Sequence, residues 1–267
     1  MIIIGEKING SIPSVAKAIA EKDADWIRNL AKIQTEAGAD FIDVCASVKD
    51  GEVETLHWLI DLVQEVTETP ICIDSPNPAA CVAAMEFCKR PGLINSVSME
   101  GNKVETIFPA IADMKWQCVA LLCAKGIPSS AEERLDVFDQ LMEKAKQYSI
   151  APGRLHIDPL VEMLCTSEDG IAMVVDVIRA VKQRQPGIHV TGAVSNISFN
   201  LPVRKLLNQA FLVLAMNAGM DSAVMDPTNR DLLGMVYATE AMLGLDDYCM
   251  EYIGAYREGK FGPVKTN

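Results

Sequence analysis

Acidic, amide and hydroxyl side chains stand at the ends of several short apolar runs in the sequence. The runs end in Asp74, Asn95, Asp158, the pair Ser195 and Asn196, and, in two further cases, Asp43 and Asp226. Any one of these side chains could simply cap a following helix, because Asp, Asn and Ser are favoured N-caps. Six such positions on one rim predict a binding site instead, since each polar group there needs a partner.

The chemistry of this set is narrow. Carboxylates and amides accept hydrogen bonds, and one carboxylate can accept two parallel N–H bonds. Such acceptors suit a planar heterocycle with several N–H donors, such as the 2-amino and N3–H edge of a pterin. The only cations near the run ends are Lys7, Lys125 and Arg204. A Schiff-base lysine or a clamp for several phosphates therefore has no support.

Histidines and cysteines do not form a metal or nucleophile motif. His57 lies in an amphipathic segment, and His156 and His189 lie within apolar runs, so we expect structural roles for all three. The eight cysteines occur singly, without a CxxC pair or zinc spacing. We therefore predict no bound metal, no disulfides, and cysteines that act as small buried apolar residues.

The elements that position these residues repeat along the chain. Short apolar runs alternate with amphipathic segments at intervals of about 25 to 35 residues, which is typical of a parallel sheet. The predicted strands are Ile2–Ile4, Phe41–Cys45, Ile71–Ile73, Leu93–Asn95, Cys118–Cys123, Leu155–Ile157, His189–Val194 and Ser222–Met225. Eight strands favour a closed α/β (β/α)8 TIM barrel, whose active site lies at the carboxyl ends of the strands. An open doubly wound sheet is the alternative, but a GxGxxG turn after the first strand is absent.

Composition supports one large folded unit. The chain has 267 residues, 49% of them hydrophobic, with no Pro-, Gly- or Ser-rich linker. We predict a single domain over residues 1–267 with a C-terminal helical extension from about residue 246. Tyr248, Tyr252 and Tyr256 recur at four-residue spacing there. This spacing predicts an aromatic stripe on one helix that packs against the barrel or a partner subunit.

The charge balance excludes whole classes of partner. A formal net charge of −12 repels polyanions, so neither nucleic acid nor an anionic membrane is expected to bind. The opening hydrophobic run has only four residues before a charge, too few for a signal peptide, and no segment reaches the roughly 20 apolar residues of a membrane span. We expect a cytoplasmic protein.

Several motifs together resemble a known family. They are the opening Ile3-Ile4-Gly5-Glu6-Lys7-Ile8-Asn9-Gly10, then Ile73-Asp74-Ser75-Pro76-Asn77, Ile94-Asn95-Ser96, Lys125-Gly126-Ile127-Pro128, Ile157-Asp158-Pro159-Leu160, Ser195-Asn196-Ile197-Ser198, and the stretch from Arg204 to Ala223. This set resembles the pterin-binding methyltransferases that move a methyl group between methyltetrahydrofolate and a corrinoid protein. Members include the methyltetrahydrofolate:corrinoid/iron-sulfur protein methyltransferases and components of O-demethylation systems, with the folate module of methionine synthase more distant.

The resemblance implies a role for each matching residue. Asp74, Asn95 and Asp158 would hold the pterin ring, and Asn196 would reach the methyl-bearing N5 as the catalytic residue. The remaining residues of the implied folate-binding set are Glu6, Ser195, Ser198 and Arg204. The family pattern further implies a homodimer, (methyl)tetrahydrofolate as substrate, and a cobalamin carried by a separate corrinoid protein.

The implied reaction requires activation of N5. The methyl group leaves a tertiary amine only if N5 gains a proton or a strong hydrogen bond. No acidic side chain is assigned to N5, and the Asn196 amide cannot give up a proton as a carboxylic acid can. We expect its hydrogen bond to strengthen in the transition state, with a water completing proton delivery. The direction of transfer is open.

The sequence departs from the family pattern at three places. Cys45 stands where asparagine is expected, Ala193 stands where glycine is expected, with Gly192 beside it, and Phe199 replaces a polar residue.

Two other functions remain as alternatives. One is a dihydropteroate synthase-like enzyme, which would need cationic stabilisation of a pyrophosphate leaving group. The other is a non-catalytic folate-binding protein, which would bind folate without turnover.

Overall fold

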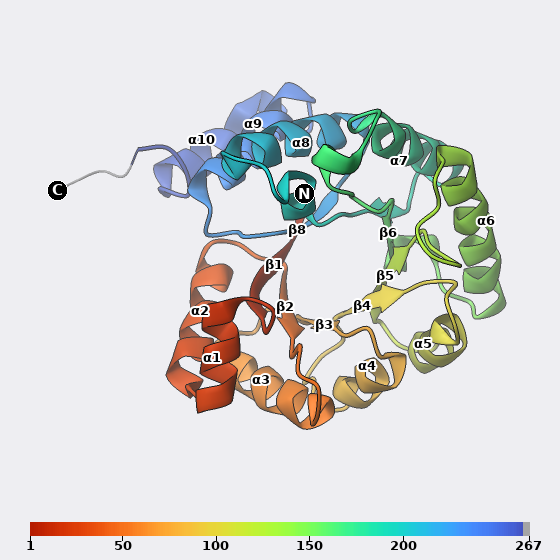
Figure 1. The fold of residues 1–267 in the computed structure, drawn as a ribbon. Coiled ribbons are helices and arrows are strands. Elements are labelled where there is room, and N and C mark those ends of the chain that lie inside the picture. Colours follow the sequence, from red (N-terminus) through yellow and green to blue (C-terminus); the bar gives the residue numbers. More distant parts are fainter. Residues whose placement is uncertain (264–267) are drawn as a thin grey trace.

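The computed structural model describes residues 1–263 and contains one eight-stranded sheet, whose strands are all parallel. Its strands are β1 (Ile2–Asn9), β2 (Phe41–Cys45), β3 (Ile71–Asp74), β4 (Leu93–Val97), β5 (Gln117–Leu121), β6 (Leu155–Asp158), β7 (His189–Val190) and β8 (Ser222–Met225). The hydrogen-bonded order is β7-β6-β5-β4-β3-β2-β1-β8. The strands form the central ring in Figure 1, and the predicted (β/α)8 barrel is confirmed. The last four residues of the predicted domain lie outside the described residues.

Helices surround this ring on the outside (Figure 1). They are α1 (Pro13–Glu21), α2 (Ala24–Glu36), α3 (Glu52–Val66), α4 (Pro78–Met85), α5 (Lys103–Ile111), α6 (Ala131–Gln147), α7 (Ala172–Arg184), α8 (Arg204–Ala218), α9 (Arg230–Met242) and α10 (Met250–Arg257). Their inner faces and the outward side chains of the strands form the main apolar core, which includes Ile42, Leu59 and Ile107. Burying these faces is what closes the helices around the sheet.

The prediction of a six-residue seventh strand is wrong. Only His189 and Val190 pair with β6, and a short 3-10 helix, η3 (Val194–Ser198), follows. The apolar residues continue past Val190 because this segment is buried. Their apolar character does not show that the segment is extended. Between β7 and β8 the wall is closed beyond that point by a single bridge between Ala193 and Val224. The seam between β7 and β8 is therefore the least regular part of the barrel.

Gly192 sits at this seam because a side chain does not fit there. A Cβ at Gly192 would lie 2.8 Å from Cγ2 of Val161, closer than real Cβ contacts. Ala193, which stands where the family pattern has glycine, instead forms the bridge to β8. The position of the glycine is thus set by the packing of the β6–α7 loop against the seam.

Every second side chain of a strand points into the barrel, because alternate residues of a strand face the same side. These inward side chains form layers. Ile4, Phe41, Cys72, Leu93 and Val119 form a separate apolar cluster. The residues two positions further along β1, β2, β3 and β4 are polar, namely Glu6, Asp43, Asp74 and Asn95. The barrel interior therefore changes from apolar to acidic toward the carboxyl ends of the strands.

The opposite end of the barrel holds a basic and neutral polar cluster. His156 is fully buried, with ring nitrogens 2.9 Å from Ser222 Oγ and 2.6 Å from Gln117 Oε1. Burial lowers the pKa of His156 to about 3, so its ring is neutral. His189 stacks on it with ring centroids 4.8 Å apart. Both histidines are thus enclosed by protein partners at the amino ends of the strands.

The C-terminal segment differs from the predicted single aromatic stripe. A 3-10 turn (Asp247–Cys249) precedes α10, and Tyr248 is 94% exposed with a left-handed backbone (φ 56°). Tyr252 and Tyr256 do share a face, and their rings lie 4.9 and 6.1 Å from that of Phe261. The regular four-residue spacing could not reveal the break after Tyr248, since the turn there is a backbone feature.

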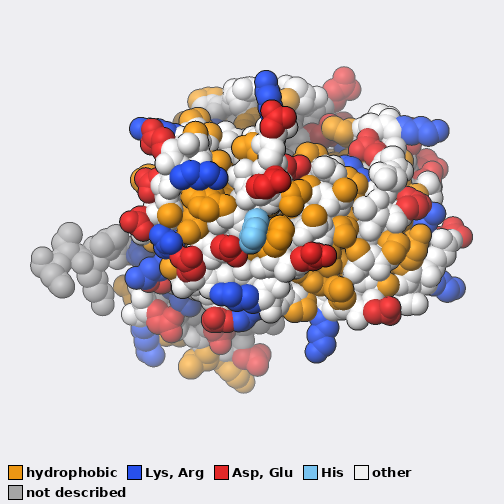
Figure 2. Space-filling view, turned by 90° about the horizontal axis from the view of Figure 1, so that it is seen from below, with side chains coloured by type: hydrophobic (Ala, Val, Ile, Leu, Met, Phe, Trp, Pro, Cys, Tyr) orange, Lys and Arg blue, Asp and Glu red, His pale blue; other side chains and the backbone are white. Residues whose placement is uncertain are grey.

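Acidic and basic side chains are interspersed with apolar ones over the face of the molecule shown in Figure 2. Within residues 1–263, no helix is long and apolar enough to cross a membrane. All eight cysteines are free thiols, but Cys165 and Cys249 are exposed, so the expectation that every cysteine is buried is wrong.

Candidate active site

A cavity of about 660 Å³ lies at the carboxyl ends of the strands. Polar residues from seven different strand ends or the loops after them converge on it. They include Glu6, Lys7, Asn9, Asp43, Asp74, Asn95, Asp158, Ser195, Asn196, Arg204 and Asp226. A hollow with convergent polar groups at this face of a barrel is where the active site of a TIM-barrel enzyme is expected.

One side of the cavity, which we call the acceptor arc, consists of Asp43, Asp74, Asn95 and Asp158 from β2, β3, β4 and β6. Asp43 is 2% exposed and accepts a hydrogen bond from Asn95 Nδ2 at 3.4 Å. Burial, followed by the nearby Asp74, raises the pKa of Asp43 well above its usual range. Burial likewise raises the pKa of Asp74 to about 6. These carboxyls lack a cation that would neutralise them.

Asp158 is fixed more firmly. Its carboxylate accepts a hydrogen bond from the backbone N–H of Leu160 at 2.8 Å, and burial raises its pKa to about 6. The fully buried Arg134 of α6 donates to the carbonyls of Pro159 and Leu160 and pairs with Glu162. Arg134 therefore holds the loop after β6 in place and leaves the outer oxygen of Asp158 for a ligand.

The other side of the cavity, the amide arc, is built on η3 beside the seam. The backbone N–H of Asn196 bonds to Ala193 O at 3.1 Å, and its side chain lines the cavity. Arg204, the first residue of α8, donates to Ser195 O at 2.8 Å and to Ser198 Oγ at 3.0 Å. Its guanidinium also lies 4.6 Å from the ring centre of Phe199. Arg204 thus supports the η3 turn that presents Ser195 and Asn196.

Glu6 and an ion pair complete the amide arc. Lys7 Nζ lies 2.9 Å from Asp226 Oδ2. Asp226 also accepts from the N–H and hydroxyl of Thr228 at 2.9 and 2.6 Å. Burial and the repulsion of Asp226 raise the pKa of Glu6 to about 7, although the nearby Ser195, Lys7 and Arg204 act in the opposite direction.

The structure brings seven of the eight sequence-predicted site residues into one cavity. The exception is Ser198, which is fully buried and bonds to Ser195 O and Arg204 instead of lining the hollow. Asp43 and Asp226, which the sequence placed on the rim, and Lys7, which it placed near a strand end, also line the cavity, although the implied folate-binding set did not include them. Lys125 does not line this cavity.

The helix-cap alternative does not hold for the rim residues. The N-cap of α4 is Asn77, whose side chain accepts from Ala79 N at 3.1 Å, not Asp74. The helices after β4, β6 and β7 begin with Asn102, Ile171 and Val203 at the N-cap, so Asn95, Asp158 and Asn196 cap none of them. The polar groups of these three side chains remain directed to the cavity.

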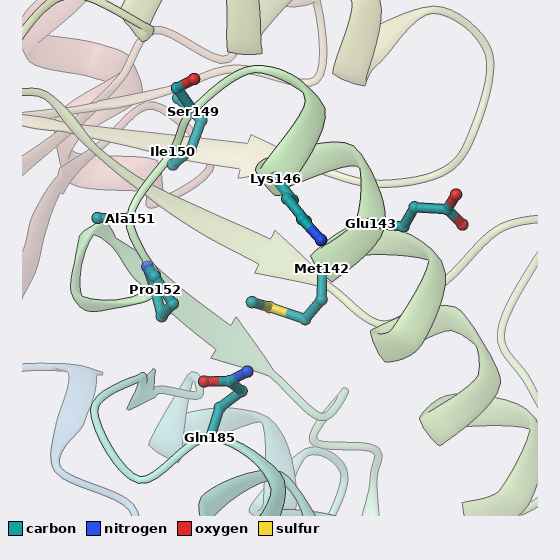
Figure 3. Close-up of a pocket in the computed structure, with 8 residues that line it drawn as sticks. All are labelled: Met142, Glu143, Lys146, Ser149, Ile150, Ala151, Pro152 and Gln185. Atoms are coloured by element: carbon teal, nitrogen blue, oxygen red, sulfur yellow. The ribbon is translucent and has the colours of Figure 1, made fainter.

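Metal binding has no support from the described part of the chain, where no group of three His, Cys, Asp or Glu side chains could hold an ion. A second hollow of about 650 Å³ lies at the amino end of the barrel between α6 and α7. Met142, Pro152 and Gln185 face one another there, whereas Glu143 points away (Figure 3). Without convergent polar groups, this hollow offers no chemistry comparable to that of the rim.

Comparison with known proteins identifies the family. The model of the family described as "Pterin binding enzyme" matches residues 6–226. The chain belongs to the pterin-binding enzymes. It is also 49% identical over 270 residues to the methylcorrinoid:tetrahydrofolate methyltransferase of Eubacterium limosum, with both chains covered completely.

More distant pterin-binding enzymes share parts of this likeness. Methionine synthase of Mycobacterium leprae is 29% identical over 251 residues, which are 86% of this chain and 21% of that protein. Dihydropteroate synthase of Yersinia pestis with a pterine-sulfa conjugate superimposes with a TM-score of 0.70 at 15% identity, over 91% of this chain and 93% of that one. The second similarity shows a shared fold alone.

Proposed function

We propose that this pterin-binding enzyme transfers a methyl group from the cobalt of a methylcorrinoid protein to N5 of tetrahydrofolate. The observation that carries the proposal is the pairing of an acceptor arc and an amide arc across one cavity. The name of the Eubacterium limosum relative, a methylcorrinoid:tetrahydrofolate methyltransferase, supports both the substrates and the direction. The corrinoid belongs to the partner protein and is a substrate of this chain.

The acceptor arc binds the pyrimidine edge of the pterin. Asp74, Asn95 and Asp158 accept the N–H donors of that edge, and the donor-rich ligand offsets the charge repulsion between Asp43 and Asp74. Burial raises the pKa values of Asp43, Asp74 and Asp158 by disfavouring the carboxylate, so a ligand that supplies N–H donors to the carboxylates gains affinity from them.

The amide arc then faces the second ring of the pterin, which contains N5. The Asn196 amide oxygen accepts a hydrogen bond from N5–H, which leaves the lone pair of N5 free for the incoming methyl group. Since this bond strengthens as positive charge develops on N5, it lowers the activation free energy of transfer more than it changes ground-state binding. Glu6, Ser195 and Arg204 belong to the same folate-binding set, and Ser198 acts by supporting Arg204.

Two observations argue against dihydropteroate synthase chemistry at this site. Lys7 is paired with Asp226, and Arg204 donates two hydrogen bonds, one to Ser195 O and one to Ser198 Oγ. The two cations of the cavity are therefore engaged, whereas a pyrophosphate leaving group would require free cationic donors.

Single-turnover mixing with free methylcobalamin and tetrahydrofolate tests the proposal. We expect the methylcobalt spectrum to convert to that of cobalt(I) while methyltetrahydrofolate forms in equal amount. Binding of tetrahydrofolate without conversion would support a non-catalytic folate-binding protein. Formation of dihydropteroate from a pterin pyrophosphate and p-aminobenzoate would contradict the assignment.

Three finer properties belong to the same proposal: a homodimer, a cytoplasmic location and a place in O-demethylation. The free state of all eight cysteines supports a reducing compartment. Sedimentation of the purified protein measures the first property directly, and a dimer is the expected result.

A further inference from the structure

Glu6 lines the cavity within the amide arc, but neither the binding of the pyrimidine edge nor the contact of Asn196 with N5 gives it a defined role. It lies on β1, two residues beyond Ile4 of the inner apolar layer, and its side chain is largely enclosed at the cavity wall. Ser195 lies beside it and favours its carboxylate form, and Ser195 precedes Asn196 in the η3 turn. Glu6, Ser195 and Asn196 line the same cavity, so Glu6 lies near the residue assigned to N5.

We propose that the Glu6 carboxylate accepts the N5 proton when tetrahydrofolate is methylated and returns it in the reverse reaction. The inference rests on the proposed function and adds the proton-transfer group that the hydrogen bond of Asn196 cannot supply. In the forward step the lone pair of N5 forms the N–CH3 bond. The electrons of the cobalt–carbon bond remain on the partner's cobalt, and the N5–H proton passes to Glu6.

The surroundings of Glu6 suit a group that gains and loses a proton near neutral pH. Burial and Asp226 favour its protonated form, whereas Ser195, Lys7 and Arg204 favour the carboxylate. Asp43 faces it from β2 as a further acid. The balance raises the pKa of Glu6 to about 7, which suits acid–base catalysis at that pH.

The other acids of the cavity are occupied differently. Asp226 pairs with Lys7 and accepts two hydrogen bonds from Thr228. Asp74 and Asp158 belong to the acceptor arc, where the pyrimidine edge lies. Asp43 is buried in the acceptor arc and accepts from Asn95, whereas Glu6 lies beside Ser195, the residue before Asn196 in the η3 turn.

The test is the pH dependence of single-turnover transfer in both directions. With methylcobalamin and tetrahydrofolate, the rate should rise with pH through about 7, because Glu6 must be ionised to take the proton. With cobalt(I) cobalamin and methyltetrahydrofolate, it should fall through the same pH, because Glu6 must then be protonated. Glu6→Gln should lower both rates by about 10²-fold or more and remove the inflection.

Two neighbours provide a readout that a purely structural role would not move. Asp226→Asn removes a negative charge and should shift the inflection about one unit to lower pH, and Lys7→Met should shift it to higher pH. Glu105→Gln, on an exposed pair with Lys144, is the matched control and should leave rate and profile unchanged. Melting curves check that each variant is folded.

The outcomes separate the two proposals. Transfer by Glu6→Gln at the wild-type rate with an unchanged pH profile would overturn the role of Glu6 and leave the methyltransferase assignment standing. A wild-type protein that transfers no methyl group would overturn the proposed function and this inference with it. Opposite shifts in Asp226→Asn and Lys7→Met, with a lost inflection in Glu6→Gln, would establish both.

Discussion

The two ends of the barrel contain charged clusters of opposite character. At the carboxyl ends of the strands, Glu6, Asp74 and Asp158 have raised pKa values, because burial disfavours their ionised forms, helped by a neighbouring acid at Glu6 and Asp74. At the amino ends, burial alone would raise the pKa of Asp221, but hydrogen bonds from His189 and Lys182 lower it to about 2. The amino end is internally satisfied, whereas the carboxyl end leaves its charge for a ligand.

This difference assigns stability to the amino end of the barrel and ligand binding to the carboxyl end. The Asp221 cluster should stabilise the fold and have no influence on folate. The rim acids should destabilise the empty fold at neutral pH and bind folate. The following substitutions test this division, beginning with the largest expected effect.

Asn196→Ala should reduce the methyl-transfer rate about 10²-fold or more, because one preorganised hydrogen-bond partner of the reacting nitrogen is removed. Affinity for tetrahydrofolate should change much less, since the bond is made mainly in the transition state. Stopped-flow spectra of the corrinoid measure the rate, and calorimetry measures the affinity. The matched control is Asn77→Ala, which removes the α4 cap and should lower stability by about 1 kcal/mol with a normal rate. A normal rate in Asn196→Ala would remove its catalytic role.

Asp74→Asn and Asp158→Asn should each weaken folate binding more than about tenfold, because an amide presents its own NH2 to the donor edge and leaves polar groups unpaired, at about 1–3 kcal/mol. Tryptophan quenching or calorimetry gives the dissociation constants. Asp176→Asn, on an exposed pair with Arg179, should bind folate normally. Unchanged affinity in both rim variants would refute the acceptor arc.

Asp221→Asn should act in the opposite way. Its carboxylate accepts from Lys182 at 2.7 Å and from Val190 N at 2.8 Å, so the substitution should lower the free energy of unfolding by about 2 kcal/mol. Denaturant titration measures this loss, and folate affinity should stay constant. Asp139→Asn, in an exposed pair with Arg184, should change stability by less than about 1 kcal/mol. Weaker folate binding in Asp221→Asn would break the proposed division.

The smallest expected effect concerns the pH dependence of stability. Asp74 and Asp158 have a pKa of about 6 in the folded chain, above the value of about 3.9 for an unfolded Asp. The folded state therefore binds more protons between these values, and the stability that these groups contribute at low pH is lost as pH rises through about 6. The double variant Asp74→Asn/Asp158→Asn should thus melt a few degrees higher than wild type at pH 8, and its melting temperature should vary less between pH 4 and 7. Thermal melts from pH 4 to 8 measure this. A double variant less stable than wild type at pH 8 would contradict the expected direction.

The fold was predictable because its signal is repeated. Eight apolar runs at regular intervals predict eight parallel strands, and their carboxyl ends must share one face, so polar residues after Ile73 and Ile157 converge. The extent of β7 was not predictable, because the buried residues of the seam are apolar whether extended or turned. The break at Tyr248 was hidden for a different reason, because the four-residue spacing of the tyrosines is the same whether or not the backbone turns between them.

The site was predictable at the level of residue types and less so in its electrostatics. Strand-end positions identify Asp74, Asn95 and Asp158 as neighbours. The ion pair of Lys7 with Asp226 joins residues 219 positions apart, which no local pattern encodes. The raised pKa of Glu6 depends on that pair and on burial, so it emerges only when β1 and β8 lie side by side.

The single bridge that closes the wall between β7 and β8 also has a consequence for evolution. The acceptor arc stands on strands that pair with both neighbours, from β2 through β6, whereas Asn196 stands on a turn secured by Arg204 and one bridge. Mutations can therefore reshape the turn without disturbing the recognition of the pterin. The strands of the acceptor arc thus preserve the binding of the pterin, while the η3 turn lies beside N5, the reacting atom. A few substitutions in that turn could therefore change the reaction without losing the substrate.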